Sequence, residues 1–155
     1  MRVGLGSDHR GRAVKDAAAA WLRAHGHEVV DFGTRTEGAC DYPDYAFPVA
    51  EGVAGGRLDR GVLVCGTGIG MSIAANKVAG VRAALVSSAA GAAQTRAHND
   101  ANVLVLAGDT TPPAQVGDIV AAFLNGPYEG GRHDRRLGKI RDYERGHAQK
   151  GEPPA

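Results

Sequence analysis

Apolar and polar positions alternate along this chain with two different periods. Short, nearly continuous apolar runs predict strands covered on both faces, at residues 2–6, 28–33, 61–65, 81–86 and 102–108. Longer amphipathic stretches between and after these runs predict helices at residues 11–25, 44–55, 69–77, 88–98 and 113–125. A last, strongly charged helix is predicted at 132–146. Pro48 should begin or break the second helix, because proline removes a helical hydrogen bond.

This alternation of strand and helix predicts the fold class. Strands separated by helices are expected to run parallel, and right-handed crossovers then place helices on both faces of the sheet. We expect an α/β protein, a Rossmann-like three-layer sandwich with a five-stranded parallel sheet, formed by residues 1–148 and followed by a disordered tail at 149–155. Such sheets bind ligands beyond the carboxyl ends of their strands, so function must be argued from the residues there.

Composition and charge exclude several classes of function. The 155 residues carry a formal net charge of +1, which gives no general attraction to nucleic acid or to a membrane surface. No apolar run approaches the roughly 20 residues that span a bilayer, and the first residues lack a signal-peptide pattern. We therefore expect a cytoplasmic protein in which Cys40 and Cys65 are free thiols. The cysteines and histidines do not have the spacing of zinc ligands, so no metal is expected.

The segment "CGTGIGMSIAANK", residues 65–77, places alternating glycines between a predicted strand and a predicted helix. The spacing is GxGxG rather than GxGxxG, and no acidic residue near position 86 could contact a ribose, so a nucleotide site is disfavoured. A turn with so little side-chain bulk can direct backbone N–H groups at a phosphate or at an oxyanion formed during a reaction. Alternatively, Gly66, Gly68 and Gly70 only permit close packing of helix on strand. The sequence leaves both interpretations open.

Cys65, the last residue of the third predicted strand, stands at the start of this turn. A lone cysteine is most often a small buried apolar residue. At a strand end that faces a helix N-terminus, however, the thiolate form is favoured and could act as a nucleophile or a general base. His98, just before the fifth strand, could supply the matching acid. Nothing in the sequence shows whether these two side chains meet.

Two further clusters lie at a strand end and at a helix start. Asp8 and His9 follow the first strand and suit proton transfer or polar ligand contact, although Asp8 alone is better explained as the cap of the next helix. Arg132 and Arg136 stand one helical turn apart after a glycine pair, so their guanidinium groups share one face and suit a phosphate. The alternatives for this segment are a solvated charged helix and a helix that reaches a partner subunit.

Taken together, these segments resemble one family. The strings "SDHRG", "DYPDYA", "CGTGIGMSIAANK", "AHNDANVL" and "YEGGRH" occur in the order found in ribose-5-phosphate isomerase B, a family grouped with the galactose-6-phosphate isomerase subunits. The resemblance extends from residue 3 to about residue 145. It implies an aldose–ketose isomerase that uses no metal and no cofactor. Its substrate would be ribose 5-phosphate or a related tetrose or hexose phosphate.

The resemblance also implies roles for individual residues. Cys65 would move a proton between C1 and C2 of the sugar through an enediolate, and backbone N–H groups of the glycine turn would hold the oxyanion. Thr67 and His98 would assist opening of the sugar ring, with Asp8 beside the sugar oxygens. The remaining substrate contacts would come from His9, Gly66, Gly68, Ile69, Gly70, Asn99, Arg132 and Arg136.

The family builds each site from two subunits, so the resemblance implies a homodimer, which could pair further into a tetramer. His98, Asn99 and the C-terminal arginines would then come from the partner subunit. The charged C-terminal helix would carry those arginines across to the site of the partner.

One position departs from the family pattern. Asp109 stands where the pentose isomerases of this family carry an arginine that contacts the phosphate. A carboxylate there would repel a phosphate or bind a sugar hydroxyl, which favours a shorter, differently hydroxylated or unphosphorylated sugar. A non-catalytic sugar-phosphate-binding protein is the alternative from another class. It is disfavoured because Cys65, Thr67 and His98 occur together.

Overall fold

The computed structural model describes residues 1–148. Its strands are β1 (Arg2–Ser7), β2 (Glu28–Asp31), β3 (Arg60–Cys65), β4 (Ala83–Leu85) and β5 (Val103–Ala107). Its helices are α1 (Arg12–Ala24), α2 (Pro43–Ala54), α3 (Ile69–Ala75), α4 (Ala89–Asn99), α5 (Pro113–Asn125) and α6 (Arg132–Ala148). The predicted tail at residues 149–155 lies outside the described residues.

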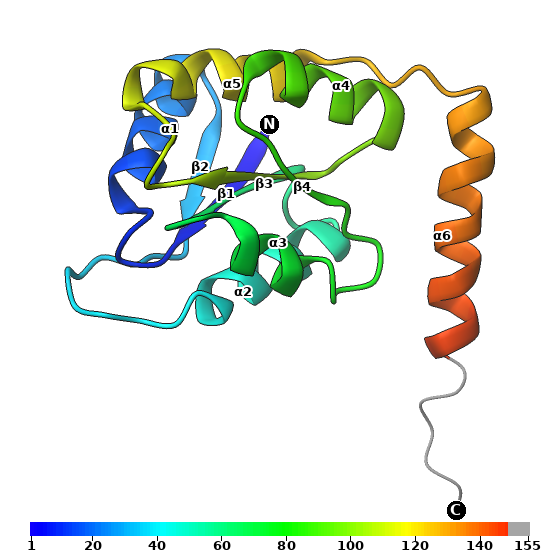
Figure 1. Cartoon of the computed structure of the whole chain (residues 1–155), viewed down its shortest axis with the longest axis horizontal. Coiled ribbons are helices and arrows are strands. Elements are labelled where there is room, and N and C mark those ends of the chain that lie inside the picture. Colours follow the sequence, from blue (N-terminus) through cyan, green and yellow to red (C-terminus); the bar gives the residue numbers. More distant parts are fainter. Residues whose placement is uncertain (149–155) are drawn as a thin grey trace, which may run out of the picture.

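The strands form one parallel sheet in the order β2-β1-β3-β5-β4. Helices α1, α4 and α5 cover one face of the sheet, and α2 and α3 cover the other, which gives the body three layers (Figure 1). The predicted α/β sandwich with a five-stranded parallel sheet is therefore confirmed.

The strand predicted at 81–86 and the effect predicted for Pro48 are wrong, each for a local reason. β4 is shorter than the strand predicted at 81–86, because it lies at the edge of the sheet and pairs with β5 alone. Pro48 neither begins nor breaks α2 but lies inside it. The helix begins instead at Pro43, where the missing N–H would have had no helical partner. It continues past Pro48 because its other face is buried through Ala46, Val49, Ala50 and Val53.

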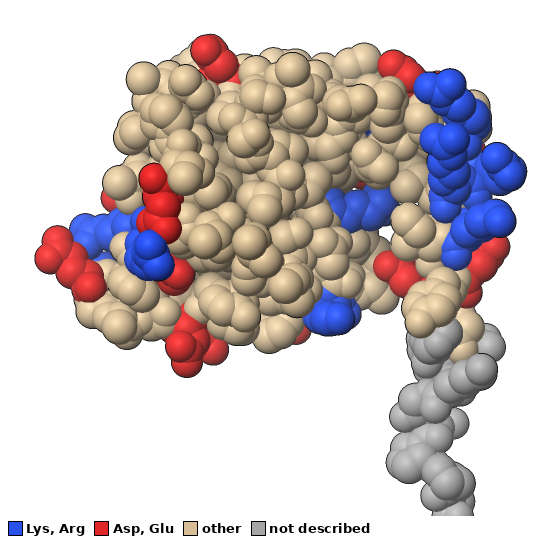
Figure 2. All heavy atoms as spheres, viewed as in Figure 1, with Lys and Arg blue, Asp and Glu red and all other residues tan. Residues whose placement is uncertain are grey.

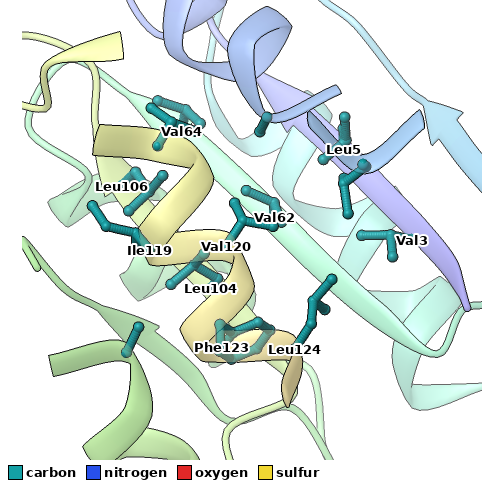
Figure 3. Close-up of a cluster of buried hydrophobic side chains, with 14 of the residues drawn as sticks. Val3, Leu5, Val62, Val64, Leu104, Leu106, Ile119, Val120, Phe123 and Leu124 are labelled. Carbon is teal, nitrogen blue, oxygen red and sulfur yellow. The ribbon is translucent and has the colours of Figure 1, made fainter. Parts of the chain in front are cut away.

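The sheet separates two apolar cores. In the larger core, side chains of β3 and β5 pack against α5, including Val62, Leu104, Leu106, Ile119, Val120 and Phe123 (Figure 3). The smaller core lies beneath α2 and α3 and includes Cys65 and Met71. Burying one large apolar side chain stabilises a fold by about 1.5–3 kcal/mol. The strand ends therefore rest on a sheet that is held firmly on both faces.

The strand order places a topological switch point at the carboxyl ends of β1 and β3, and we call the region beyond these ends the crevice. From β1 the chain crosses to β2 through α1 on one face of the sheet. From β3 it crosses in the opposite direction, to β4, through α3 on the other face. Because the two connections diverge, the strand ends between them stay open. Ligands of parallel α/β sheets bind at such a switch point.

Helix α6 stands apart from this body (Figure 1). Gly130 and Gly131 precede it with φ angles of +64° and +60°, a left-handed conformation that turns the chain away from α5. Among its side chains described through residue 146, only His133 and Leu137 are buried, and its main contacts are with α4. None of the described helices is long and apolar enough to cross a membrane.

Candidate active site

The carboxyl ends of β1 and β3 bring Asp8 and Cys65 side by side. Ser7 pairs with Val64 in the parallel register, and the Asp8 N–H donates to the Val64 carbonyl at 3.2 Å. Cys65 is only 4% exposed, and its carbonyl accepts a hydrogen bond from the Gly108 N–H at 2.8 Å. The thiol is therefore fixed at the crevice by neighbours on both sides of β3.

Asp8 caps the turn that leads into α1. Its Oδ1 accepts hydrogen bonds from the N–H groups of Arg10 (2.9 Å) and Gly11 (3.0 Å). The predicted helix cap is displaced, because α1 starts only at Arg12 and its N-cap residue is Gly11. The second carboxylate oxygen of Asp8 makes no hydrogen bond with the described residues. That oxygen is available to a ligand in the crevice.

The glycine turn after β3 fits both interpretations of its sequence. Gly68 has a φ of +74°, and a Cβ there would overlap Leu85 Cδ1 and lie 3.0 Å from the Leu106 carbonyl oxygen. Close packing therefore requires glycine at this position. Nevertheless, the N–H groups of Gly66, Thr67 and Gly68 donate to no other group within the described part of the chain. The turn is tightly packed and still offers a row of backbone donors to an anion.

Neighbouring side chains shape the rest of this turn. The Thr67 hydroxyl accepts a hydrogen bond from the Ile69 N–H at 3.3 Å, which fixes it at the start of α3. The ring of Tyr42 lies against Gly70, where a Cβ would come within 2.7 Å of a ring carbon. Tyr42 is therefore a wall of the site that the sequence argument did not include among the site residues. Its signal was the segment "DYPDYA", in which it stands.

His9 is held by the segment that precedes α2. Its Nδ1 accepts a hydrogen bond from the Cys40 N–H at 3.3 Å, with the Cys40 Sγ 4.0 Å away. Because Nδ1 accepts, the proton of the neutral ring lies on Nε2. His9 lines a hollow of about 400 Å³ together with Arg10 and Arg12. Asp16 and Glu37 also line this hollow, and both pair with Arg12. The Nε2 donor of His9 and the Arg10 guanidinium are the groups that suit an anionic ligand.

Asp109 lies just after β5 and is paired with Arg10. Its N–H donates to the Gly66 carbonyl at 3.0 Å, and its Oδ2 binds Arg10 Nη2. A Cβ on Gly66 would lie 2.9 Å from Arg10 Nε and 3.1 Å from Asp109 Oδ2, so the pair lies directly over the glycine turn. The carboxylate thus faces a cation. Arg10 was not among the predicted site residues. The only sequence feature that pointed to it is its position directly after Asp8 and His9.

The other predicted residues lie at the end of α4 and the start of α6. His98 and Asn99 line a hollow of about 440 Å³ together with Ser87 and Ser88. The ring of His98 stacks on that of His133, with the centroids 4.5 Å apart. This contact joins α4 to α6 and places His98 beside the first turn of α6.

A charged cluster surrounds His133. Glu129 Oε2 lies 3.8 Å from Nε2 of both His98 and His133, and Arg132 Nε donates to His133 Nε2 at 3.5 Å. Burial lowers the pKa of His133 and neighbouring positive charges lower it further, while Glu129 acts in the opposite direction. His98, Glu129 and His133 place ligand atoms within 4.8 Å of one another, as a metal site would. The Arg132 guanidinium, which donates to His133 Nε2, would compete with a cation there.

Asp100 fixes the end of α4 that carries His98. It has a φ of 44°, a left-handed conformation that ends the helix. Its Oδ1 binds Arg96 Nη1 at 2.7 Å, and its Oδ2 binds Arg82 Nη2 at 2.9 Å. Arg82 Nε also donates to the Asn99 carbonyl at 3.1 Å. These charge-assisted bonds orient the last turn of α4.

Arg132 and Arg136 are exposed on α6, along which Lys and Arg side chains form a column (Figure 2). No hydrogen bond or ion pair joins them, or His98, to Cys65 within residues 1–148. The predicted site residues therefore fall into two groups. We call the first the thiol half: Asp8, His9, Cys65, Gly66, Thr67, Gly68, Ile69, Gly70 and Asp109. We call the second the histidine half: His98, Asn99, Arg132 and Arg136.

Comparison with known proteins shows which family shares this arrangement. A family model described as Ribose/Galactose Isomerase matches residues 3–140. The chain belongs to the ribose/galactose isomerase family. A putative sugar phosphate isomerase of Bacillus subtilis is 46% identical to it over 145 residues, which are 93% of this chain and 97% of that relative. Ribose-5-phosphate isomerase B of Escherichia coli is 45% identical over 139 residues, 90% of this chain and 93% of the relative.

Solved structures of this isomerase family have the same fold. Ribose-5-phosphate isomerase B of Clostridium thermocellum gives a TM-score of 0.92 at 46% identity, over 95% of this chain and 99% of that chain. The Mycoplasma genitalium protein with bound ribulose-5-phosphate gives 0.89 at 44% identity, over 93% and 96%. The predicted family and the isomerase class are thus confirmed. The roles of single residues and the homodimer remain predictions.

Proposed function

We propose that this family member interconverts a phosphorylated aldose and its ketose, with Cys65 as the base. The supporting observation is that Cys65 lies at the switch point, directly before three backbone N–H groups that have no partner in the described chain. A proton on the carbon next to a carbonyl is weakly acidic, so its removal requires stabilisation of the oxyanion that forms. The turn supplies a base and such donors together.

The proposed reaction moves protons and changes no net oxidation state. The Cys65 thiolate takes the proton from C2 of the open-chain aldose. The C–H electron pair forms the C1–C2 double bond, and the carbonyl pair moves to O1. The N–H groups of Gly66, Thr67 and Gly68 hold this oxyanion. The thiol then returns a proton to C1, and the hydroxyl proton at O2 passes to O1. The free oxygen of Asp8 would bind the sugar hydroxyls.

We infer that the substrate is ribose 5-phosphate or a close relative. The Escherichia coli relative is a ribose-5-phosphate isomerase, and the Mycoplasma genitalium structure contains ribulose-5-phosphate. The Nε2 donor of His9 and the exposed guanidinium groups of Arg132 and Arg136 suit the phosphate, which carries close to two negative charges at neutral pH.

We infer that the histidine half acts on the thiol half of a second copy. Ring opening needs an acid near Cys65, and His98 makes no hydrogen bond or ion pair with Cys65 within residues 1–148. Apolar side chains are exposed beside both halves, with Ile73 on α3 55% exposed and Ile140 on α6 48% exposed. Covering such surface favours association by about 25 cal/mol per Å². In the resulting homodimer, Thr67 would face His98 of the partner subunit.

Solvent exchange tests this function. In D₂O, the wild type should form ketose from ribose 5-phosphate and place deuterium at the carbon that receives the proton. A panel of tetrose, pentose and hexose phosphates then ranks the substrates by kcat/KM. A chain that binds these sugars but exchanges no hydrogen in any of them is a binding protein, and that result would contradict the proposal.

Cys65→Ser should lower isomerase activity by about 10²–10⁴-fold, because a hydroxyl at the same place is a far weaker base. The substitution is nearly isosteric, so the cooperative unfolding transition should persist. Cys40→Ser is the matched control, since Cys40 is the other free thiol. The variant keeps the backbone N–H that donates to His9 and changes only the sulfur 4.0 Å from the ring. Near-normal turnover of the Cys65→Ser variant would assign the base to another residue.

A further inference from the structure

We propose that Arg10, positioned by Asp109, binds the phosphate of the substrate and sets the preference for a phosphorylated sugar. The identity of the ligand as a sugar phosphate rests on the proposed function. The anion-binding role of Arg10 rests on the geometry around the glycine turn.

The backbone of Arg10 is locked between two strand ends. Its N–H donates to Asp8 Oδ1 at 2.9 Å, at the end of β1. On its other side the chain after β5 packs so closely that a Cβ on Gly108 would lie 2.6 Å from the Arg10 carbonyl oxygen. The side chain of Arg10 therefore starts from a fixed point at the mouth of the crevice.

The guanidinium is aimed over the glycine turn. It pairs with Asp109 through Nη2, and its Nε lies where a Cβ on Gly66 would come within 2.9 Å. Gly66 follows Cys65 directly in the sequence, so the Arg10 guanidinium lies against the residue next to the proposed base, Cys65. Guanidinium carries five N–H donors. In the described residues, only Nη2 has a hydrogen-bond partner, so the other donors remain for a ligand.

Stability does not explain a charge at this place. The side chain of Arg10 is 58% exposed and that of Asp109 34%, and ion pairs exposed to this extent contribute little to stability. The neighbouring Arg12 differs from Arg10, because its two carboxylate partners, Asp16 and Glu37, line the same hollow as Arg12 itself. The partner of Arg10 comes from the end of another strand. This partner, Asp109, holds the Arg10 guanidinium across the crevice, whereas Asp16 holds that of Arg12 along α1.

Phosphate fits the groups gathered here. The hollow of about 400 Å³ contains His9, whose Nε2 carries the proton, beside the Arg10 fork. The two carboxylates that also line it, Asp16 and Glu37, are paired with Arg12. A planar fork and a second N–H donor match the oxygens of a phosphate monoester. Asp109 then acts as a positioning residue. Its charge is balanced by Arg10, so it does not exclude phosphate as its place in the sequence alone suggested.

The test compares five proteins: the wild type, Arg10→Gln, Arg10→Lys, Asp109→Asn and the control Arg23→Gln. Arg23 is an exposed arginine in the last turn of α1, about 17 Å along the helix from its first residue. Inorganic phosphate is the binding probe, titrated by calorimetry. In parallel, kcat and KM are measured with ribose 5-phosphate, or with the best sugar phosphate of the panel.

Arg10→Gln should weaken phosphate binding and raise KM by about tenfold or more, with little change in kcat, because a charge-assisted bond is lost. Arg10→Lys should fall between it and the wild type, since lysine keeps the charge and loses the fork. Asp109→Asn should weaken binding by a smaller factor, about threefold, because Arg10 keeps its charge and loses its orientation. Arg23→Gln should match the wild type.

Three outcomes would overturn the proposal. Equal phosphate affinity in Arg10→Gln and Arg23→Gln removes Arg10 from the site. A lower kcat of Arg10→Gln with unchanged phosphate affinity would mean that Arg10 only stabilises the glycine turn. Tighter phosphate binding in Asp109→Asn means that Asp109 repels the phosphate. If the wild type isomerises no sugar phosphate, the proposed function fails, and the phosphate titrations still decide the role of Arg10 independently.

Discussion

The thiol half and the histidine half of the site are built in different ways. The thiol half lies where β1, β3 and β5 end, and main-chain bonds such as Gly108 N–H to the Cys65 carbonyl tie its loops together. The histidine half lies on the end of α4 and on α6, which buries only His133 and Leu137 among its side chains described through residue 146. The sheet thus preorganises the Cys65 thiol, whereas in the proposed homodimer the histidine half would reach the substrate only through assembly of two subunits.

The largest effect after loss of the thiol itself is expected from Gly68→Ala. An alanine there must adopt a φ of +74° and would collide with Leu85. Displacing the turn removes donors from the oxyanion, so kcat should fall by about 10²–10³-fold. Steady-state kinetics and urea unfolding check this result.

Gly26→Ala is the matched control for that substitution. Gly26 has a φ of +76°, and a Cβ there would meet no atom within 4 Å. Both variants bear the cost of a left-handed alanine, about 1–2 kcal/mol, but only Gly68→Ala disturbs the turn. Equal loss of activity in the two variants would show that stability, not the geometry of the thiol half, limits turnover.

A smaller effect is expected from Asp100→Ala, which loosens the histidine half alone. The variant loses bonds to Arg82 and Arg96 and the side chain that favours a φ of 44°. We expect kcat/KM to fall about tenfold, because His98 loses its fixed orientation. The rate at which iodoacetamide alkylates Cys65 should not change.

Asp100→Asn is the more conservative variant, since asparagine also tolerates the left-handed conformation. Its kcat/KM should lie between those of the wild type and Asp100→Ala. A change in the alkylation rate of Cys65 in either variant would mean that the two halves are coupled within one chain.

The smallest effect concerns pH. Burial and neighbouring cations lower the pKa of His133 in the folded protein, whereas the unfolded chain keeps the ordinary value of 6.5. The unfolded chain therefore binds more protons below that pH, and the contribution of His133 to stability is lost as pH falls below about 6.5. In urea unfolding between pH 7.5 and 5.5, His133→Phe should lose less stability than the wild type. Parallel losses would show that His133 is not perturbed in solution.

Much of this fold follows from local patterns in the sequence. The strand and helix periods, with the right-handed crossover, were enough to predict a parallel sheet with helices on both faces. The strand predicted at 81–86 is longer than the observed β4, because an edge strand forms hydrogen bonds with one neighbour only. Pro48 was misjudged because burial of the opposite face keeps α2 intact, a tertiary effect that propensity does not contain.

The site could be predicted only in part. Asp8 directly follows β1 and Cys65 is the last residue of β3, and these strands pair in register, so their closeness is implied by the fold. The Arg10–Asp109 pair joins residues 99 positions apart in the sequence, and only the strand order brings β1 and β5 within reach of the same turn. The sequence also could not show that no hydrogen bond or ion pair joins His98 to Cys65 in the described residues, because it carries no distance between the end of a helix and the end of a strand.

The most direct test of the account mixes two inactive chains. Cys65→Ser disables the thiol half and His98→Ala disables the histidine half, so neither homodimer should isomerise the sugar. After subunit exchange, followed with two affinity tags, each mixed dimer would contain one intact site. For random exchange, about a quarter of the wild-type activity should return. Absence of any recovery after demonstrated exchange would mean that each site is built within one chain, and would contradict the shared site proposed here.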